Sequence, residues 1–120
     1  MADILICDDS VFMRLVLKKL LEENGHHIVG EASDGEEAVE LYKTLRPELT
    51  TMDITMPKQD GLQAVKVIHN INPTAKVIMV TAIGQQPVIL KALQTGAVDF
   101  IVKPFDSQQI ISTINKVLVS

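Results

Sequence analysis

The stretch TTMDITMP, residues 50–57, reads as a buried strand that ends in a carboxylate. Leu49, Met52 and Ile54 are apolar, yet Asp53 lies among them and Pro57 follows shortly after. A lone buried carboxylate costs free energy unless a partner or ligand compensates for it. The role of Asp53 therefore depends on the fold around this strand and on the side chains that lie near the end of the strand.

Outward from this stretch, apolar strand-like runs alternate with helical periodicity five times. KVIMVT (76–81) is apolar on both faces, as a central parallel strand should be, whereas residues 13, 16, 17, 20 and 21 have the apolar spacing of one helix face. The expected strands are residues 4–7, 28–29, 49–53, 76–81 and 98–102. The first three expected helices begin near residue 10, residues 33–35 and residues 60–61, and they end at Asn24-Gly25, Pro47 and Pro73. A fourth helix is expected over residues 87–95. The last helix is expected after Ser107, which could cap it.

Five consecutive strand–helix units predict an α/β fold, in which a parallel sheet is covered by helices on both faces. For five such units the flavodoxin-like strand order 2-1-3-4-5 is the common solution. We expect one (βα)5 domain over residues 1–120, because the chain is long enough for one core and shows no linker or internal repeat.

The composition excludes several classes of protein. Eleven basic and 15 acidic residues give a net charge of −4, with the basic residues scattered, which argues against direct nucleic-acid binding. Cys7 is the single cysteine, so an internal disulfide and a multi-cysteine metal site are excluded, and a buried hydrophobic role is expected. Without a signal peptide or an apolar run of transmembrane length, a cytoplasmic protein with no membrane insertion is expected.

Polar side chains collect at the carboxyl ends of the expected strands, which is where ligands of such sheets bind. The first strand ends in Asp8 and Asp9, the third in Asp53, the fourth in Thr81 and the fifth in Lys103. The second strand, at the sheet edge, contributes nothing comparable. The topology therefore predicts that three carboxylates, a hydroxyl and an ammonium converge on one edge of the sheet.

Three ionised carboxylates need compensation, because each pair at about 4 Å repels by roughly 4 kcal/mol at an effective dielectric near 20. The sum over three pairs rivals the whole stability of a domain, about 5–15 kcal/mol. Lys103 can offset one of the charges, and hard oxygen ligands beside an open edge suit Mg²⁺. Since a carboxylate can attack a phosphoryl group, we predict that Asp53 is a phosphoryl acceptor, with Mg²⁺ and Lys103 neutralising charge and Thr81 bonding a phosphoryl oxygen.

Each of these residues also has a simpler interpretation. The role of Asp9 or Ser10 could be simply to cap the first helix. Thr81 has the ordinary strand propensity of a threonine, and an isolated lysine such as Lys103 is usually a solvated surface charge. Their coincidence at strand ends of one topology favours the functional interpretation. For His26 and His27, exposed loop positions are expected.

Longer stretches carry a family resemblance over essentially the whole chain. They are ILICDDSVFMR (4–14), GEASDGEEAVE (30–40), TMDITMPKQDG (51–61), VIMVTAIGQQ (77–86) and GAVDFIVKPF (96–105). The acidic pair, the central Asp followed by Met-Pro and Asp-Gly, the Thr and the Lys-Pro together resemble the receiver domain of two-component response regulators. MDITMP, GQQ and FMR are similar to the chemotaxis-type subgroup.

The resemblance implies roles for the site residues. Asp53 would receive a phosphoryl group from a histidine kinase, and Asp8, Asp9 and Asp53 would hold Mg²⁺ with the backbone carbonyl of Thr55. Lys103 would contact the phosphoryl group, and the Lys103–Pro104 bond would be cis.

The resemblance also implies a switch. Thr81 would move towards the phosphate and Phe100 would swing inward, which changes an output surface on the fourth helix, fifth strand and fifth helix that includes Ile89. Chemotaxis members often carry Tyr where this chain has Phe100, so a hydroxyl contact is absent here. Thr55 and Ile83 stand at positions that influence the lifetime of the phosphate.

The expected function is a free-standing, phosphorylation-activated signalling switch, a monomer that is not an enzyme beyond its own phosphorylation and dephosphorylation. Its expected partners are a chemotaxis-type histidine kinase, a phosphatase and a target such as the flagellar motor switch protein. The alternative is a receiver cut from a larger regulator with a DNA-binding or catalytic output domain.

Two other classes fit the sequence less well. A flavin-binding electron carrier would need amide-rich residues after the first strand, where CDDSVFMR offers carboxylates. A Mg²⁺-dependent phosphohydrolase would usually place its nucleophile after the first strand and would need residues for a substrate cap, which this chain lacks.

Overall fold

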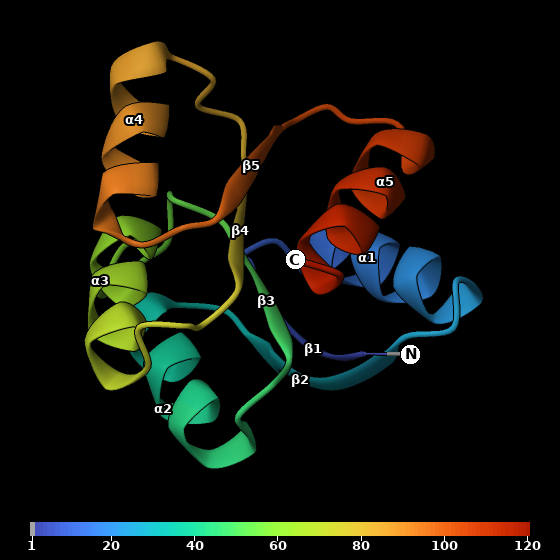
Figure 1. Cartoon of the computed structure of the whole chain (residues 1–120), viewed down its shortest axis with the longest axis horizontal. Helices are drawn as coiled ribbons and strands as arrows, with labels where there is room; N and C mark the ends of the chain where they lie inside the picture. The colour runs from blue at the N-terminus through green and yellow to red at the C-terminus, as the bar shows by residue number, and fades with distance from the viewer. Residues whose placement is uncertain (1) are drawn as a thin grey trace.

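The structure, a computed structural model, describes residues 2–120, in which five strands form one parallel sheet of order β2-β1-β3-β4-β5. The strands are β1 (Asp3–Cys7), β2 (His27–Ala32), β3 (Leu49–Met52), β4 (Val77–Thr81) and β5 (Asp99–Val102). The helices are α1 (Val11–Glu23), α2 (Gly35–Leu45), α3 (Gly61–Ile71), α4 (Gln86–Thr95) and α5 (Ser107–Leu118). Helices α1 and α5 lie on one side of the sheet and α2, α3 and α4 on the other, which confirms the expected flavodoxin-like α/β fold (Figure 1).

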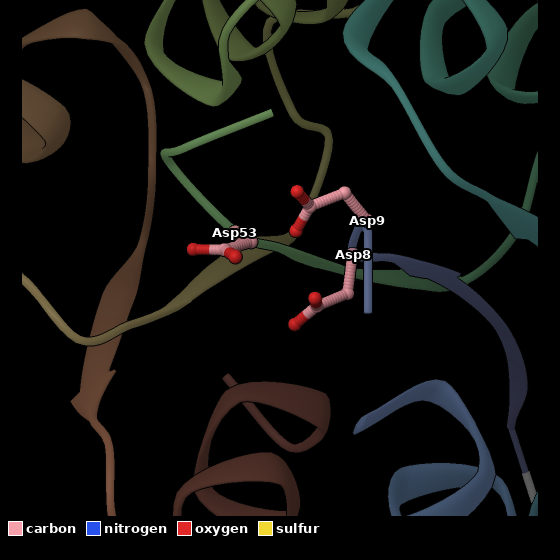
Figure 2. A group of neighbouring side chains, drawn as sticks. All are labelled: Asp8, Asp9 and Asp53. Carbon is pink, nitrogen blue, oxygen red and sulfur yellow. The ribbon is translucent and has the colours of Figure 1, made fainter. Parts of the chain in front are cut away.

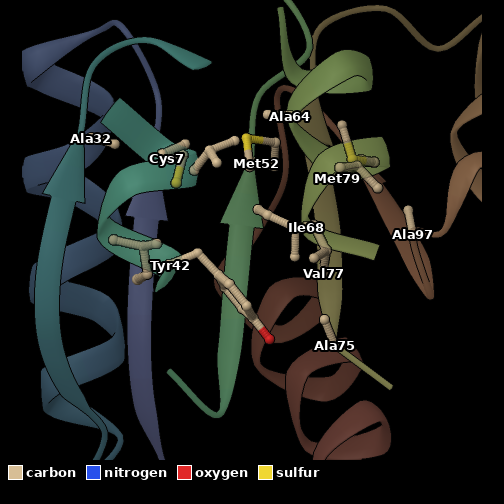
Figure 3. Packing of buried hydrophobic residues seen from close by; sticks show 14 of the residues in the cluster. Cys7, Ala32, Tyr42, Met52, Ala64, Ile68, Ala75, Val77, Met79 and Ala97 are labelled. Carbon is tan, nitrogen blue, oxygen red and sulfur yellow. The ribbon is translucent and has the colours of Figure 1, made fainter. Parts of the chain in front are cut away.

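The two faces of the sheet bury two apolar clusters. One cluster lies under α2, α3 and α4 and includes Tyr42, Met52, Ile68 and Met79 (Figure 3). The other lies under α1 and α5, where Leu17, Leu21, Ile110 and Ile114 pack on the strands. Cys7 belongs to the first cluster, and burial raises the pKa of its thiol, so the residue is a packing group as expected.

Some boundaries differ from the expectation. β2 extends over six residues because it pairs with β1 along the whole of that strand. The sequence suggested a shorter strand because exposed His27 and Glu31 interrupt its apolar pattern. The prediction for His26 was wrong, since this side chain is buried and its Nδ1 accepts a hydrogen bond of 3.1 Å from the Ala2 amide. The cap of α5 is Asp106 rather than Ser107, which is the first residue of the helix.

Two Asp-Gly pairs shape the loop that follows β3. Asp34 and Asp60 cap α2 and α3, each accepting a hydrogen bond from the amide three residues on. A Cβ atom at Gly61 would lie 1.9 Å from the carbonyl oxygen of Asp53, and one at Gly35 would lie 1.9 Å from that of Gln59. Both glycines are required by close backbone approach, and together they hold the loop between Asp53 and α3.

Within residues 2–120, no helix is both long and apolar enough to cross a membrane.

Candidate functional site

The carboxyl ends of β1 and β3 bring three acidic side chains together. Asp8 and Asp9 follow β1 and Asp53 follows β3, and one carboxylate oxygen from each lies within 4.8 Å of the others (Figure 2). Asp8 is 2% exposed and Asp53 7% exposed, whereas Asp9 is open to solvent. The predicted convergence of the three carboxylates is therefore found in the structure.

Lys103 lies between the two buried carboxylates. Its Nζ is 2.7 Å from Asp8 Oδ2 and 3.3 Å from Asp53 Oδ2. Across residues 2–120, Asp9 makes no ion pair of this kind. One ammonium thus faces three carboxylates, which leaves an excess of negative charge at this edge of the sheet.

The protonation of Asp53 and Lys103 responds to this crowding. Burial raises the pKa of the Asp53 carboxyl; the Lys103 ammonium opposes the rise, and the Asp8 carboxylate adds to it. Burial lowers the pKa of Lys103, but the hydrogen bond to Asp8 and the charges of both carboxylates outweigh it, so the net shift is upward. Lys103 is therefore a fixed positive charge at neutral pH, and Asp53 is a carboxylate that gains from a further cation.

The segment after β1 shows that Ser10 caps the first helix. Its hydroxyl accepts a hydrogen bond from the Met13 amide at 3.1 Å, and its own amide donates to Asp8 Oδ1 at 2.9 Å. Asp9 has no capping role in this arrangement, so the alternative interpretation holds for Ser10 and not for Asp9. The Asp9 carboxylate remains with the acidic cluster.

Thr81 is buried at the end of β4, beside the residue that carries the ammonium. Its hydroxyl accepts a hydrogen bond from the Ile83 amide at 3.0 Å, and its carbonyl accepts one from the Lys103 amide at 2.8 Å. A hydroxyl that accepts one bond can still donate its proton to another acceptor. Thr81 can therefore hold the β4–α4 turn and still offer a donor at the site.

The remaining predicted residues lie around this edge. Thr55 is exposed in the β3–α3 loop, next to Ile54, whose carbonyl accepts a hydrogen bond of 2.8 Å from the Gly61 amide. Phe100 on β5 is half-buried against the cluster under α4, and Ile89 on α4 is also half-buried. The Lys103–Pro104 bond is cis, as the resemblance implied.

The donor set fits a hard divalent cation. Three carboxylates beside one ammonium carry an excess of about two negative charges, which is the charge that a divalent cation supplies. The donors are oxygens, the ligand type of Mg²⁺. An exposed Asp9 leaves one side of the cluster open, as is needed for a metal that keeps some of its waters.

The sequence analysis missed the residues that hold the backbone in place around the acidic cluster. Gly35 and Gly61 carry a visible signal, the repeated Asp-Gly pair, but a helix start is the simpler reading of that signal. The role of Arg14 was also missed: this residue donates a hydrogen bond of 2.6 Å to the Asp8 carbonyl and another of 3.2 Å to Glu31 on β2. Strand β2 adds no side chain to the acidic cluster, but its Glu31 bonds Arg14, a contact that the sequence analysis did not foresee.

Taken together, the fold and the site define a small α/β domain whose chemistry centres on an acidic cluster with one ammonium. The family model for the response regulator receiver domain matches residues 4–115. The chain belongs to this family of phosphorylation-dependent signalling domains, which are not enzymes in the usual sense.

Several relatives that cover nearly the whole chain are chemotaxis proteins. The chain is 50% identical over 115 residues to chemotaxis protein CheY of Bacillus subtilis, covering 96% of each chain. It is 48% identical over 114 residues to chemotaxis protein CheY of Thermotoga maritima, covering 95% of each. Among solved structures, the CheX–CheY–BeF3–Mg²⁺ complex from Borrelia burgdorferi matches with a TM-score of 0.96 at 38% identity, covering 98% of this chain and 90% of that one.

Proposed function

We propose that this chain is a chemotaxis-type signalling switch that accepts a phosphoryl group on Asp53 in a Mg²⁺-dependent reaction. The observation that carries the proposal is the cluster of Asp8, Asp9 and Asp53 with Lys103 between its two buried members. Within this cluster three carboxylates face one ammonium, so the carboxylates are in excess. Such an arrangement stores electrostatic repulsion that a cation and a phosphoryl group can relieve.

In the proposed reaction, an Asp53 carboxylate oxygen attacks the phosphorus of the donor. The new bond makes an aspartyl phosphate, while the bond from phosphorus to the donor breaks and the donor's imidazole or acetate leaves. Asp8, Asp9, Asp53 and the Thr55 carbonyl would hold Mg²⁺, which when bound neutralises charge on the phosphoryl oxygens. The Lys103 ammonium would leave Asp53 for a phosphoryl oxygen.

The response to phosphorylation would begin at Thr81. Its hydroxyl proton is available for a phosphoryl oxygen, and it lies at the base of the β4–α4 turn that carries Ile83. A shift of this turn would relieve or tighten the packing of Phe100, which lies against the same cluster as Ile83. Helix α4 with Ile89, strand β5 and helix α5 would then form the output surface.

The partners follow from the same reasoning. A histidine kinase would supply the phosphoryl group, and a phosphatase would remove it. The resemblance to a CheY that was solved in complex with CheX supports binding to a partner protein, and the similarity to two chemotaxis proteins supports a role in chemotaxis. The target proposed on this basis is the flagellar motor switch protein. No direct contact with nucleic acid is expected, and the chain would act as a monomeric domain over residues 1–120.

Intact-mass spectrometry with acetyl phosphate and Mg²⁺ tests this function. Wild type should gain one phosphoryl adduct, and EDTA should prevent it. The Asp53→Asn variant should gain none, whereas the control Asp3→Asn, at the opposite edge of the sheet, should behave like wild type. An adduct on Asp53→Asn, or none on wild type with any small phosphodonor, would contradict the proposal.

A further inference from the structure

Asp8 is held at each of its polar atoms. Its amide donates to the Ala32 carbonyl at 2.9 Å, its Oδ1 accepts from the Ser10 amide at 2.9 Å, and its Oδ2 accepts from Lys103 Nζ at 2.7 Å. Its carbonyl oxygen accepts from Arg14 Nη1 at 2.6 Å. The last of these bonds does not involve the carboxylate, so it needs a separate explanation.

The carbonyl of Asp8 belongs to the peptide that leads into Asp9. Because a peptide unit is planar, a bond that fixes its oxygen also fixes its N–H and the direction in which the next residue leaves. Asp9 is exposed, and among residues 2–120 its carboxylate makes no hydrogen bond or ion pair within the fold. The backbone therefore sets the position of the Asp9 Cβ atom, from which the carboxylate extends.

Arg14 is itself oriented from the edge strand. Its Nε donates to Glu31 Oε1 at 3.2 Å, and its side chain is 15% exposed. Lys18 approaches the other oxygen of Glu31 at 3.9 Å, but this lysine is 42% exposed and makes no bond to Asp8. The planar guanidinium can bond both groups at once because its N–H donors have a fixed fork geometry, which an ammonium lacks.

We propose that Arg14, oriented by Glu31, is a positioning residue for the cation site: it pins the Asp8–Asp9 peptide so that the Asp9 carboxylate faces Asp8 and Asp53. This inference rests on the proposed function, since it concerns the Mg²⁺ that the acidic cluster would hold. Edge strand β2 then contributes to the site through Glu31, although it places no side chain in the acidic cluster.

The role of Arg14 is separable from its charge. Loss of a positive charge near carboxylates should strengthen the binding of a cation, whereas loss of the pinned peptide should weaken it. Residues that orient metal ligands typically change metal affinity by about 10–100-fold when mutated. The Arg14→Met variant is therefore expected to bind Mg²⁺ at least about tenfold more weakly than wild type.

Two further variants separate geometry from charge. Arg14→Lys keeps the charge but cannot bond the Asp8 carbonyl and Glu31 in the same geometry, so its Mg²⁺ affinity should fall at least as far as that of Arg14→Met. Lys18→Met removes the other cation beside Glu31 and should leave the affinity unchanged. Glu31→Gln keeps an acceptor for Nε and should have a smaller effect than Glu31→Ala.

The experiment is calorimetric titration of each metal-free variant with MgCl₂, together with amide hydrogen exchange of Asp9 and Ser10 in the absence of metal. Weaker Mg²⁺ binding with faster exchange in both Arg14 variants, and neither change in Lys18→Met, supports the proposal. Binding within twofold of wild type in Arg14→Met, or in Arg14→Lys, would overturn it. If wild type itself binds no Mg²⁺, the proposed function fails first, so the two failures are distinguishable.

Discussion

The two edges of the same sheet treat their charged groups in opposite ways. At the amino edge, where the strands begin, Asp3 pairs with His27 at 3.3 Å and Asn72 donates to the Tyr42 hydroxyl at 3.0 Å. Lys76 donates to the carbonyls of Leu118 and Ser120, both at 3.3 Å. At the carboxyl edge, where the strands end, Asp8 and Asp53 share the ammonium of Lys103, and Asp9 lies beside them with no ion pair to residues 2–120.

This difference separates the part of the fold that serves stability from the part that serves function. The hydrogen bonds and the exposed Asp3–His27 contact at the amino edge each lower the free energy of the folded state by a small amount. Unbalanced carboxylates at the carboxyl edge cost free energy until a ligand arrives.

The largest effect is expected when Lys103 is replaced by Met in the metal-free protein. Removing one partner of a buried ion pair typically costs about 3–5 kcal/mol, because the carboxylates that remain are unpaired. The control is Lys58→Met, which removes an exposed cation 3.7 Å from Asp34 and should cost less than about 1 kcal/mol. Denaturant unfolding measures both changes, and equal losses would show that the carboxyl edge is not strained.

Mg²⁺ should stabilise the wild type against thermal unfolding. At ten times its dissociation constant, a ligand that binds only the folded state adds about 1.4 kcal/mol. Differential scanning fluorimetry with MgCl₂ should show this rise in the wild type and in Asp3→Asn, and should lose it when Asp8 and Asp9 are both changed to Asn. If MgCl₂ still stabilised the variant with both substitutions, Mg²⁺ would bind at another site.

A change at the amino edge should affect stability and nothing else. Tyr42→Phe removes the acceptor of the Asn72 amide and should cost about 1 kcal/mol, the usual value of one hydrogen bond. Its phosphoryl adduct with acetyl phosphate should match that of wild type by intact mass. Reduced phosphorylation in this variant would mean that the two edges are coupled.

The smallest effect concerns pH. The pKa of Asp53 in the folded state is raised above its ordinary value of 3.8, so the folded protein holds this proton more tightly than the unfolded chain. Ionised Asp53 therefore lowers stability at neutral pH, and the penalty disappears as the pH falls through the folded pKa towards the ordinary value.

Unfolding of the metal-free wild type and of Asp53→Asn, followed from pH 7 to pH 4, measures this penalty. The variant should be the more stable at pH 7, and its advantage should shrink as the pH falls. If the stability advantage of the variant instead grew towards acid pH, the pKa of Asp53 would be lowered in the folded protein rather than raised.

Much of this architecture could be predicted because local patterns and topology agree. Alternating strand-like and helical periodicity gave the strand order, and the order placed Asp53 beside Asp8. The burial of His26 and the length of β2 could not be predicted, since both depend on which residues an edge strand meets. The hydrogen bond from Arg14 to the Asp8 carbonyl could not be predicted either, because every residue has a backbone carbonyl and the sequence does not indicate which one accepts a bond.

The most direct test of the account is a residue-resolved one. Amide chemical shifts of ¹⁵N-labelled protein would be recorded metal-free, then with MgCl₂, and then with acetyl phosphate. If the carboxyl edge binds the metal and the phosphoryl group, the shifts should change first around Asp8, Asp9 and Asp53 and next along Thr81, Ile83 and Phe100. The shifts of Asn72 and Lys76 at the amino edge should stay the same. Changes centred on the amino edge, or none at the carboxyl edge with either addition, would contradict it.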